Sequence, residues 1–217
     1  DDLSSLKNCV MNALRNCEEN SNLLGWVRAS DAIGDFTYPY VLENQEFCME
    51  YISTTVIKYT KKLYIRMLAD GIQYYTDRYS WNAGGTITKS LKNKNQLIVD
   101  EFPDGAFQAY TVRLEEASQK GKIYIIDAEF FIDDCNYVEH QYLGLTNSFP
   151  VRNLTLCVRV ANNLKLLECK YNMYGHSVDR VPKISKVIKP KSGIIEHTFK
   201  NLVIGERYNL EWRVVKK

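Results

Sequence analysis

Hydrophobic and polar residues alternate along much of this chain with a period of two, which is typical of strands that bury one face. Clear runs occupy residues 96–102, 106–116, 122–132, 182–188 and 193–199. Turn-forming residues, including Pro, Gly and Asp, separate several of these runs. The pattern predicts a mainly β chain of about ten antiparallel strands, arranged as a sandwich or a barrel.

Two stretches favour hairpins. In "NLTLCVRVANNLKLLECKY", a fold-back about residue 163 would place Cys157 opposite Cys169, which predicts a hairpin closed by its own disulfide. In "YIRMLADGIQYYTDRY", Asp70 and Gly71 suit a type I′ turn, because both central residues of that turn have positive φ.

Helical spacing occurs near the N-terminus. Residues 3–17 repeat apolar side chains at intervals of three and four, and Asp1, Asp2 and Ser4 can cap the start, so we expect an amphipathic helix there. The stretch "CMEYISTTVIKYTKK", residues 48–62, fits a helix by spacing and a strand by its β-branched residues. We favour a strand.

Six cysteines, an even number without metal-site spacing, predict disulfide staples. Cys9 and Cys17 would lie about 12 Å apart along a helix, too far to bond each other. They would therefore pair with Cys48 and Cys135 and fasten the helix to the β body.

Composition indicates one globular domain, residues 1–217, because 45% of the residues are hydrophobic and 25% are charged. No apolar run reaches the roughly 20 residues that a membrane-spanning helix needs. The triplet "NLT" makes Asn153 an N-glycosylation acceptor. Together with the cysteines and a first residue that is not Met, it predicts a secreted, extracellular glycoprotein.

Charge is distributed unevenly. Residues 151–217 hold 14 Lys and Arg against five Asp and Glu, whereas the preceding residues hold 14 against 21. The change suggests a sub-boundary near 145–150, between an acidic part (1–147) and a basic part (148–217). The basic part could bind a polyanion, or its charges could simply be solvated or attract the acidic part. A polyanion would meet the basic run formed by Lys186, Lys189 and Lys191, but this run lacks the interleaved aromatics of a nucleic-acid binder.

Catalytic motifs are missing from the sequence. It contains no HExxH, GxSxG or phosphate-binding loop. The densest acidic group lies around Asp127, Glu129, Asp133 and His140, and a solvated strand face explains it better than acid–base chemistry does. We therefore expect a protein that is not an enzyme and needs no cofactor or metal.

Tyrosines are abundant, with 15 in the chain, and exposed tyrosines favour binding surfaces, although tyrosine also suits strands. Asp127 and Glu129 could meet a cationic amine if they point into a pocket. The aromatic candidates for ligand or partner binding are Tyr38, Tyr40, Tyr74, Tyr75, Tyr79 and Trp81.

Two stretches resemble known families. "LVIGERYNLEWRV" resembles the tyrosine corner of fibronectin type III modules, with Leu202, Gly205 and Tyr208 at the matching positions. The resemblance implies that Gly205 bends the chain and that the Tyr208 hydroxyl bonds to the backbone just upstream. "KIYIIDAEFFIDDCNYV" resembles a strand of tick salivary lipocalins, although the adjacent Gly25 and Trp26 depart from their usual Gly-x-Trp. The size and character are similar to those of secreted tick immunosuppressants.

These observations lead to three functional hypotheses. The first is a secreted, non-enzymatic binding protein that engages a host protein or an immune-cell surface component to modulate immunity. The second is a lipocalin-like carrier of a biogenic amine, lipid or other small ligand. The third is a cytokine-decoy module. An internal cavity favours the carrier, and a flat tyrosine-rich sheet favours protein binding.

Overall fold

The strands dominate the molecule. The computed structural model describes residues 39–80, 85–104, 107–134, 140–176 and 178–217, and within these ranges it contains 13 strands and no helix. The strands are β1 (Tyr40–Tyr51), β2 (Val56–Met67), β3 (Tyr74–Tyr79), β4 (Gly85–Leu91), β5 (Leu97–Asp104), β6 (Phe107–Arg113), β7 (Ile123–Asp134), β8 (His140–Thr146), β9 (Asn153–Val160), β10 (Leu164–Tyr174), β11 (Ile184–Val187), β12 (Ile194–Lys200) and β13 (Arg207–Lys216).

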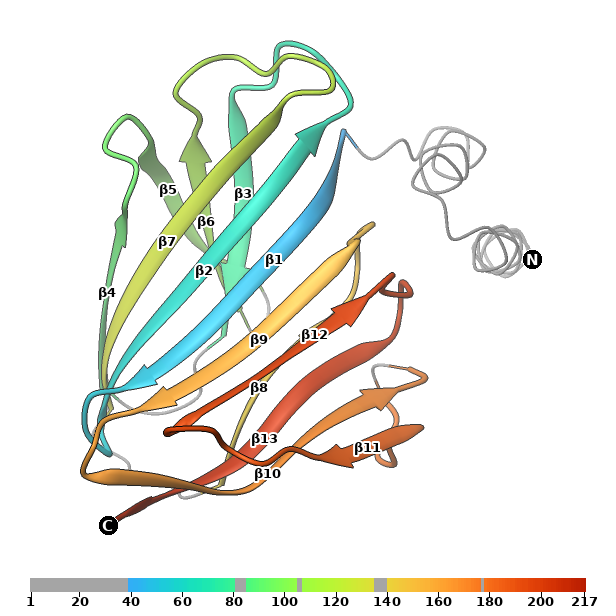
Figure 1. The fold of residues 1–217 in the computed structure, drawn as a ribbon. Coiled ribbons are helices and arrows are strands. Elements are labelled where there is room, and N and C mark those ends of the chain that lie inside the picture. The colour runs from blue at the N-terminus through green and yellow to red at the C-terminus, as the bar shows by residue number, and fades with distance from the viewer. Residues whose placement is uncertain (1–38, 81–84, 105–106, 135–139, 177) are drawn as a thin grey trace.

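Three sheets form from these strands (Figure 1). The large sheet has the order β12-β9-β1-β2-β7-β4, the four-stranded sheet β11-β10-β13-β8 and the three-stranded sheet β3-β6-β5. The mainly β prediction is confirmed. The pairing of β1 with β9 is parallel, which differs from the expected antiparallel arrangement. The large sheet draws strands from both sides of residues 145–150.

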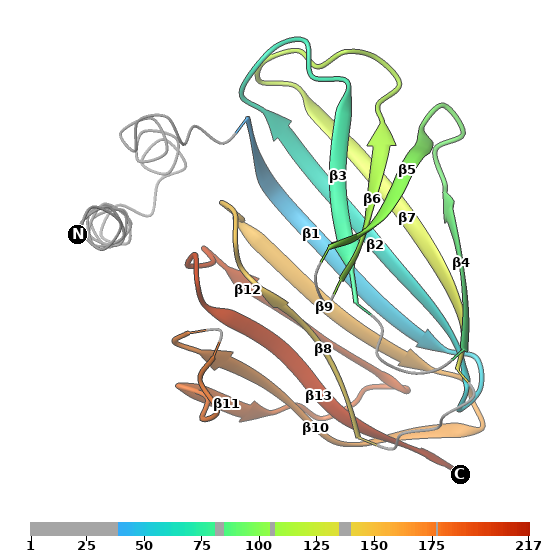
Figure 2. The same ribbon diagram turned by 180° about the vertical axis from the view of Figure 1, so that it is seen from behind.

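Alternating burial explains how the sheets pack. Along β1, Gln45, Phe47, Met49 and Tyr51 are buried while the residues between them are more exposed. We call the face that carries these buried residues the inner face of the large sheet. Seen from behind, both smaller sheets lie on this side (Figure 2). The three sheets thus share one hydrophobic core.

Aromatic contacts mark the packing between sheets. Tyr51 on β1 meets Trp212 on β13 with ring centroids 6.3 Å apart. Phe130 on β7 lies 4.9 Å from the ring of Tyr79 and 5.8 Å from that of Tyr110. Edge-to-face and tilted pairs of this kind add to the free energy gained by burying the rings.

Both predicted hairpins are wrong. Strands β9 and β10 follow each other in the chain but belong to different sheets, because β9 pairs with β1 and β12 while β10 pairs with β11 and β13. Cys157 and Cys169 are accordingly free thiols. Strand β3 pairs with β6 rather than with β2, and Gly71 alone, not Asp70, has positive φ.

Other details follow from local chemistry. The ambiguous residues 48–62 form the end of β1, a turn and the start of β2, and the Ser53 hydroxyl accepts the N–H groups of Thr55 and Val56 in that turn. The free thiols include Cys48 as well, so the described cysteines form no staple. The predicted helix over residues 3–17, which contains Cys9 and Cys17, lies outside the described residues, and so does Cys135.

The corner before β13 has a defined geometry. Gly205 has φ of 89°, and its N–H donates to the backbone carbonyl of Asn147. The Tyr208 hydroxyl accepts the Val203 N–H at 2.9 Å and donates to Glu206 at 2.7 Å. Leu202 is fully buried beside this turn. These bonds fix the entry of β13, whose inward residues then reach the core.

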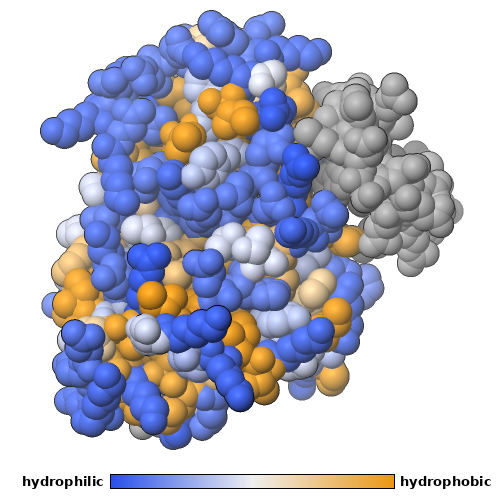
Figure 3. Space-filling model, viewed as in Figure 1, coloured by the Kyte–Doolittle hydropathy of each residue, from blue (hydrophilic) through white to orange (hydrophobic). Residues whose placement is uncertain are grey.

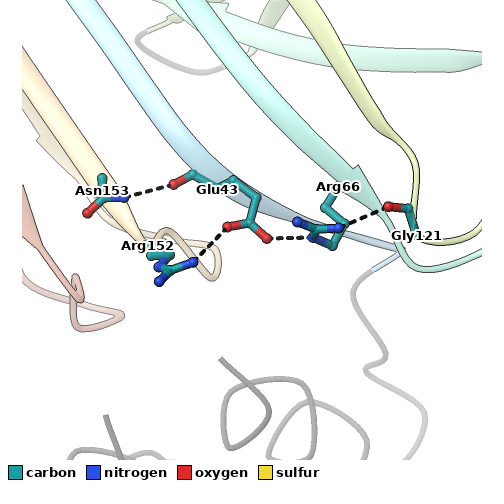
Figure 4. A network of polar contacts seen from close by, with 5 residues as sticks. All are labelled: Glu43, Arg66, Gly121, Arg152 and Asn153. Carbon is teal, nitrogen blue, oxygen red and sulfur yellow. Dashed lines mark hydrogen bonds and ion pairs between the residues drawn. The ribbon is translucent and has the colours of Figure 1, made fainter. Parts of the chain in front are cut away.

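A polar network joins β1, β2, the start of β9 and the turn before β7 (Figure 4). Glu43 accepts from Arg66 at 2.5 Å and pairs with Arg152 at 3.6 Å, while Arg66 also donates to the Gly121 carbonyl at 3.0 Å. The half-buried Asn153 side chain donates to the Glu43 carbonyl at 3.3 Å. This hydrogen bond uses one of the two amide hydrogens of Asn153, and an N-linked glycan would replace the other. Glycosylation of Asn153 stays a prediction.

Candidate functional site: an aromatic hollow between the sheets

A hollow of about 1640 Å³ lies against the inner face of the large sheet and extends between the two smaller sheets. All three sheets contribute to its wall, with Phe47 and Tyr59 from the large sheet, Tyr79 from the three-stranded sheet and Tyr142 and Trp212 from the four-stranded sheet. In the view from behind, β1 is visible between the smaller sheets (Figure 2). Alternation places Phe47, Tyr59 and Tyr79, because they occupy the positions of β1, β2 and β3 that point away from solvent.

One end of the hollow is aromatic. Tyr59 lies 5.5 Å from Phe130 and 6.3 Å from Phe47 between ring centroids. Tyr79 completes the group against Phe130. Burial raises the pKa of the Tyr59 hydroxyl well above its usual range, with a smaller contribution from the negative charge of Asp77. The ring stays neutral at physiological pH and offers an apolar surface to a ligand.

A buried ion pair stands beside the aromatic group. Lys61 Nζ lies 2.6 Å from Asp77 Oδ2 and donates to the Arg78 carbonyl at 2.8 Å. The Tyr110 hydroxyl donates to Asp77 at 2.6 Å, and the ammonium of Lys61 sits 5.0 Å from the centre of the Phe47 ring. Because a charge this deep needs a partner, the pair neutralises the wall rather than presenting a reactive base.

A second polar group lies on the four-stranded sheet. Glu211 accepts from Asn172 at 2.6 Å and from the Tyr174 hydroxyl at 3.3 Å, and it pairs with Lys170 at 2.9 Å. The guanidinium of Arg207 lies 3.9 Å from the centre of the Tyr174 ring. The hollow therefore combines an aromatic end with a hydrogen-bonding end.

Several buried polar atoms in the wall have no hydrogen-bond partner among the described residues. They are Gln45 Oε1, Asn209 Oδ1, Trp212 Nε1 and both side-chain polar atoms of Asn147. Such atoms lose their hydration on folding, and an unmade hydrogen bond costs about 1–3 kcal/mol. These atoms have almost no accessible surface, so a ligand in the hollow would meet them only after the side chains move.

The structure separates the predicted aromatic residues. Tyr40, Tyr75 and Tyr79 line the hollow, whereas Tyr74 is 53% exposed and lies outside it. Tyr38 and Trp81 lie outside the described residues. Tyr74 and Tyr75 differ because they are neighbours on one strand and therefore point to opposite faces of the sheet.

Asp127 and Glu129 are not in the hollow. They point outward from β7, where Glu129 pairs with Lys58 at 2.9 Å and Asp127 with Lys92 at 3.5 Å. The expected amine-binding role in a pocket therefore does not fit their positions. This outer face, seen in Figure 3, is mostly hydrophilic over β1 and β2. Asp77, which sequence reasoning did not single out, is the acidic group beside the aromatic end.

The basic run is exposed. Lys186, on β11, and Lys189 and Lys191, which follow that strand, are all exposed. In the part of the chain that the structure describes, none of the three forms an ion pair. Their charges are therefore available to an anionic partner.

No group of three or more His, Cys, Asp or Glu side chains among the described residues could hold a metal ion. No helix in the described ranges is long and apolar enough to cross a membrane.

Comparisons with known proteins show a partial likeness to solved structures. No protein-family model and no curated protein matches the sequence. A protease candidate from Parabacteroides distasonis matches with a TM-score of 0.46 and 10% identity, over 81% of this chain and 40% of that one. An M1 zinc metallopeptidase from Deinococcus radiodurans matches with a TM-score of 0.44 and 10% identity, over 81% and 42%. This chain thus spans about two fifths of the length of these structures, and a likeness of this degree assigns it no activity.

Proposed function

We propose that this chain is a non-catalytic binding protein that holds an amphipathic ligand in the hollow. The observation that carries the proposal is the hollow itself, with aromatic rings at one end and hydrogen-bonding side chains at the other. Ligand sites commonly measure about 300–1,000 Å³ and combine apolar walls with a few polar groups. At about 1640 Å³ this hollow suits a ligand larger than a simple amine.

The wall also indicates the chemistry of the ligand. An apolar or aromatic body would pack against Phe47, Tyr59 and Tyr79. Donors and acceptors on the ligand would meet polar side chains at the hydrogen-bonding end, such as Glu211 and Lys170. Because Lys61 and Asp77 already neutralise each other, the ligand needs no net charge at the aromatic end.

A fluorescent probe tests the proposal. We expect 8-anilinonaphthalene-1-sulfonate to bind the folded chain with enhanced emission, and Tyr79→Ala to weaken its binding at least threefold because one wall of the aromatic end is lost. Tyr74→Ala is the matched control, since Tyr74 is on the same strand but outside the hollow. Equal affinity for both variants would overturn the proposal.

Native mass spectrometry supplies an independent measurement. A molecule retained by the chain through purification, and lost in the Tyr79→Ala variant but not in Tyr74→Ala, would support the carrier function. Retention by both variants would place the molecule outside the hollow.

Secretion and engagement of a host immune protein, including the cytokine-decoy alternative, remain proposals. Secretion is supported by the glycosylation triplet that begins at Asn153, the half-buried first residue of β9. The likeness to tick salivary proteins stays a prediction from sequence.

Polyanion binding is a second candidate function, favoured by the exposed basic run. We expect the chain to bind heparin. The triple variant K186Q/K189Q/K191Q should elute from immobilised heparin at lower salt, because it forms fewer charge contacts and its binding therefore releases fewer counterions. The control variant replaces three exposed lysines elsewhere, Lys94, Lys120 and Lys165. If both variants elute together, net charge rather than this run explains the binding.

A further inference from the structure

Two cysteines lie side by side on the outer face of the large sheet. Cys48 on β1 is the register partner of Cys157 on β9, in the parallel pair that joins these strands. Cys48 is half-buried and Cys157 is 4% exposed. The two thiols are close enough to shift each other's pKa in opposite directions.

Strand geometry brings the pair within bonding range. Neighbouring strands lie about 4.7–4.9 Å apart, and the Cα atoms of disulfide-bonded cysteines are usually about 4.4–6.8 Å apart. Register partners point to the same face of a sheet, and Cys48 alternates with the inward Phe47 and Met49. Both sulfurs therefore face outward, away from the hollow.

The surroundings favour a thiolate on one member. The neighbouring Cys48 thiol lowers the pKa of Cys157, and the nearby Arg159 adds to this effect, while burial and Glu196 oppose it. The Cys157 thiol and burial raise the pKa of Cys48. Cys169, which lacks such a partner, has its pKa raised to about 11 by burial. A thiol with a lowered pKa beside a second thiol is an arrangement that favours thiol–disulfide exchange.

We propose that Cys48 and Cys157 form a redox-active dithiol that closes to a disulfide by exchange with a low-molecular-weight disulfide. The Cys157 thiolate attacks one sulfur of the oxidant, forms a mixed disulfide and releases one thiolate. Cys48 then loses its proton to that thiolate, and its sulfur attacks the Cys157 sulfur and releases the second thiolate. Two cysteine sulfurs are oxidised while the external disulfide is reduced to two thiols.

The cross-link would join distant parts of the sequence. It closes a loop of more than one hundred residues and ties β1 to β9, the one parallel pairing among the described strands. Closing a loop of this length restricts the unfolded chain strongly, so we expect the oxidised form to unfold at a higher temperature.

Peptide mapping of the full chain tests the inference. The reduced protein, made in bacteria so that Asn153 carries no glycan, is incubated with excess oxidised glutathione, quenched with acid, alkylated with N-ethylmaleimide and digested with trypsin. We expect a cross-linked species that joins residues 29–58 to residues 153–159. A link from 153–159 to another cysteine peptide, or alkylation of both thiols, would overturn the proposal.

Matched variants separate the pair from the other thiols. Cys169→Ser leaves the pair intact and should form the same cross-link. Cys48→Ser should stop at a glutathione adduct on Cys157, and Arg159→Gln should slow the exchange roughly threefold to tenfold because less thiolate is present. An unchanged rate in Arg159→Gln, with circular dichroism showing a native fold, would contradict the role of Arg159. The pair lies outside the hollow, so these results are independent of ligand binding.

Discussion

The Lys61–Asp77 pair shows how single residues shape the interior of the hollow. Lys61 occupies an inward position of β2, where the alternation would otherwise place an apolar residue, and it is 5% exposed. Asp77 compensates its charge and holds the Tyr110 hydroxyl as well. The three groups fix the three-stranded sheet against the large sheet beside the aromatic end.

Removing one member of the pair should be costly. We expect Asp77→Ala to lower the free energy of unfolding by about 3–5 kcal/mol, because it leaves the Lys61 ammonium buried without a counter-charge. Asp104→Ala, which removes an exposed partner of Arg78, should cost less than about 1 kcal/mol. Urea unfolding of both variants measures the difference, and similar costs would show that the buried pair is not special.

His197 should make stability depend on pH. Its ring stacks on Tyr171 at 3.7 Å between centroids, and burial, together with the charge of Lys186, lowers the pKa of His197. A lowered folded-state pKa means that the stabilising contribution is present above the unfolded value of about 6.5 and is lost as the pH falls through and below it.

The measurement compares thermal unfolding at about pH 7.5 and about pH 5. We expect the loss of stability on acidification to be smaller in His197→Phe than in the parent, since Phe keeps the stacking but takes up no proton. His176→Gln changes an exposed histidine and serves as the control. An identical pH dependence in His197→Phe would exclude this residue as the cause.

Each strand of the large sheet depends on close backbone approach to its neighbour, and β4 is the clearest case at the element scale. Strand β4 begins at Gly85, opposite the end of β7. Gly85 has φ of 137°, and a Cβ atom there would lie 2.0 Å from the Asp133 carbonyl oxygen. The glycine therefore permits the pairing that extends the large sheet to its last strand.

Replacing this glycine tests the role of β4. We expect Gly85→Ala to lower the free energy of unfolding by roughly 2–3 kcal/mol, because both the φ value and the backbone contact oppose a side chain. Gly121→Ala, at φ of 84° with open space around the added atom, should cost only about 1 kcal/mol. Equal losses in chemical denaturation would mean that φ alone matters.

At the scale of the whole molecule, sequence patterns predicted strands better than their partners. Alternation located β5, β6, β7, β11 and β12. A buried face explains the signal in β6, β7 and β12, whereas β5 and β11 are almost wholly exposed. Strand β8 lacks a comparable signal around Gly144, and the hairpins failed because pairing is decided by distant strands. The tyrosines were recognised as a group, but only the folded sheets separate Tyr75 from Tyr74.

The buried ion pair of the site was not predicted from the sequence either, because distant strands bring its two residues together. Lys61 and Asp77 are 16 positions apart and look like ordinary surface charges until two sheets bring them together. A lysine in phase with the buried residues of a strand is the one local signal that could have indicated it. Similarly, no spacing rule connects Cys48 with Cys157.

The parallel pairing of β1 and β9 also affects how the chain is made. When β1 leaves the ribosome, one of its edges stays bare until β9 has been synthesised about one hundred residues later. At about 5–20 residues per second, this interval lasts roughly 5–20 seconds. An open strand edge can pair with a neighbouring nascent chain. Productive synthesis of this protein should therefore be sensitive to translation speed and to chaperones that shield the first strands.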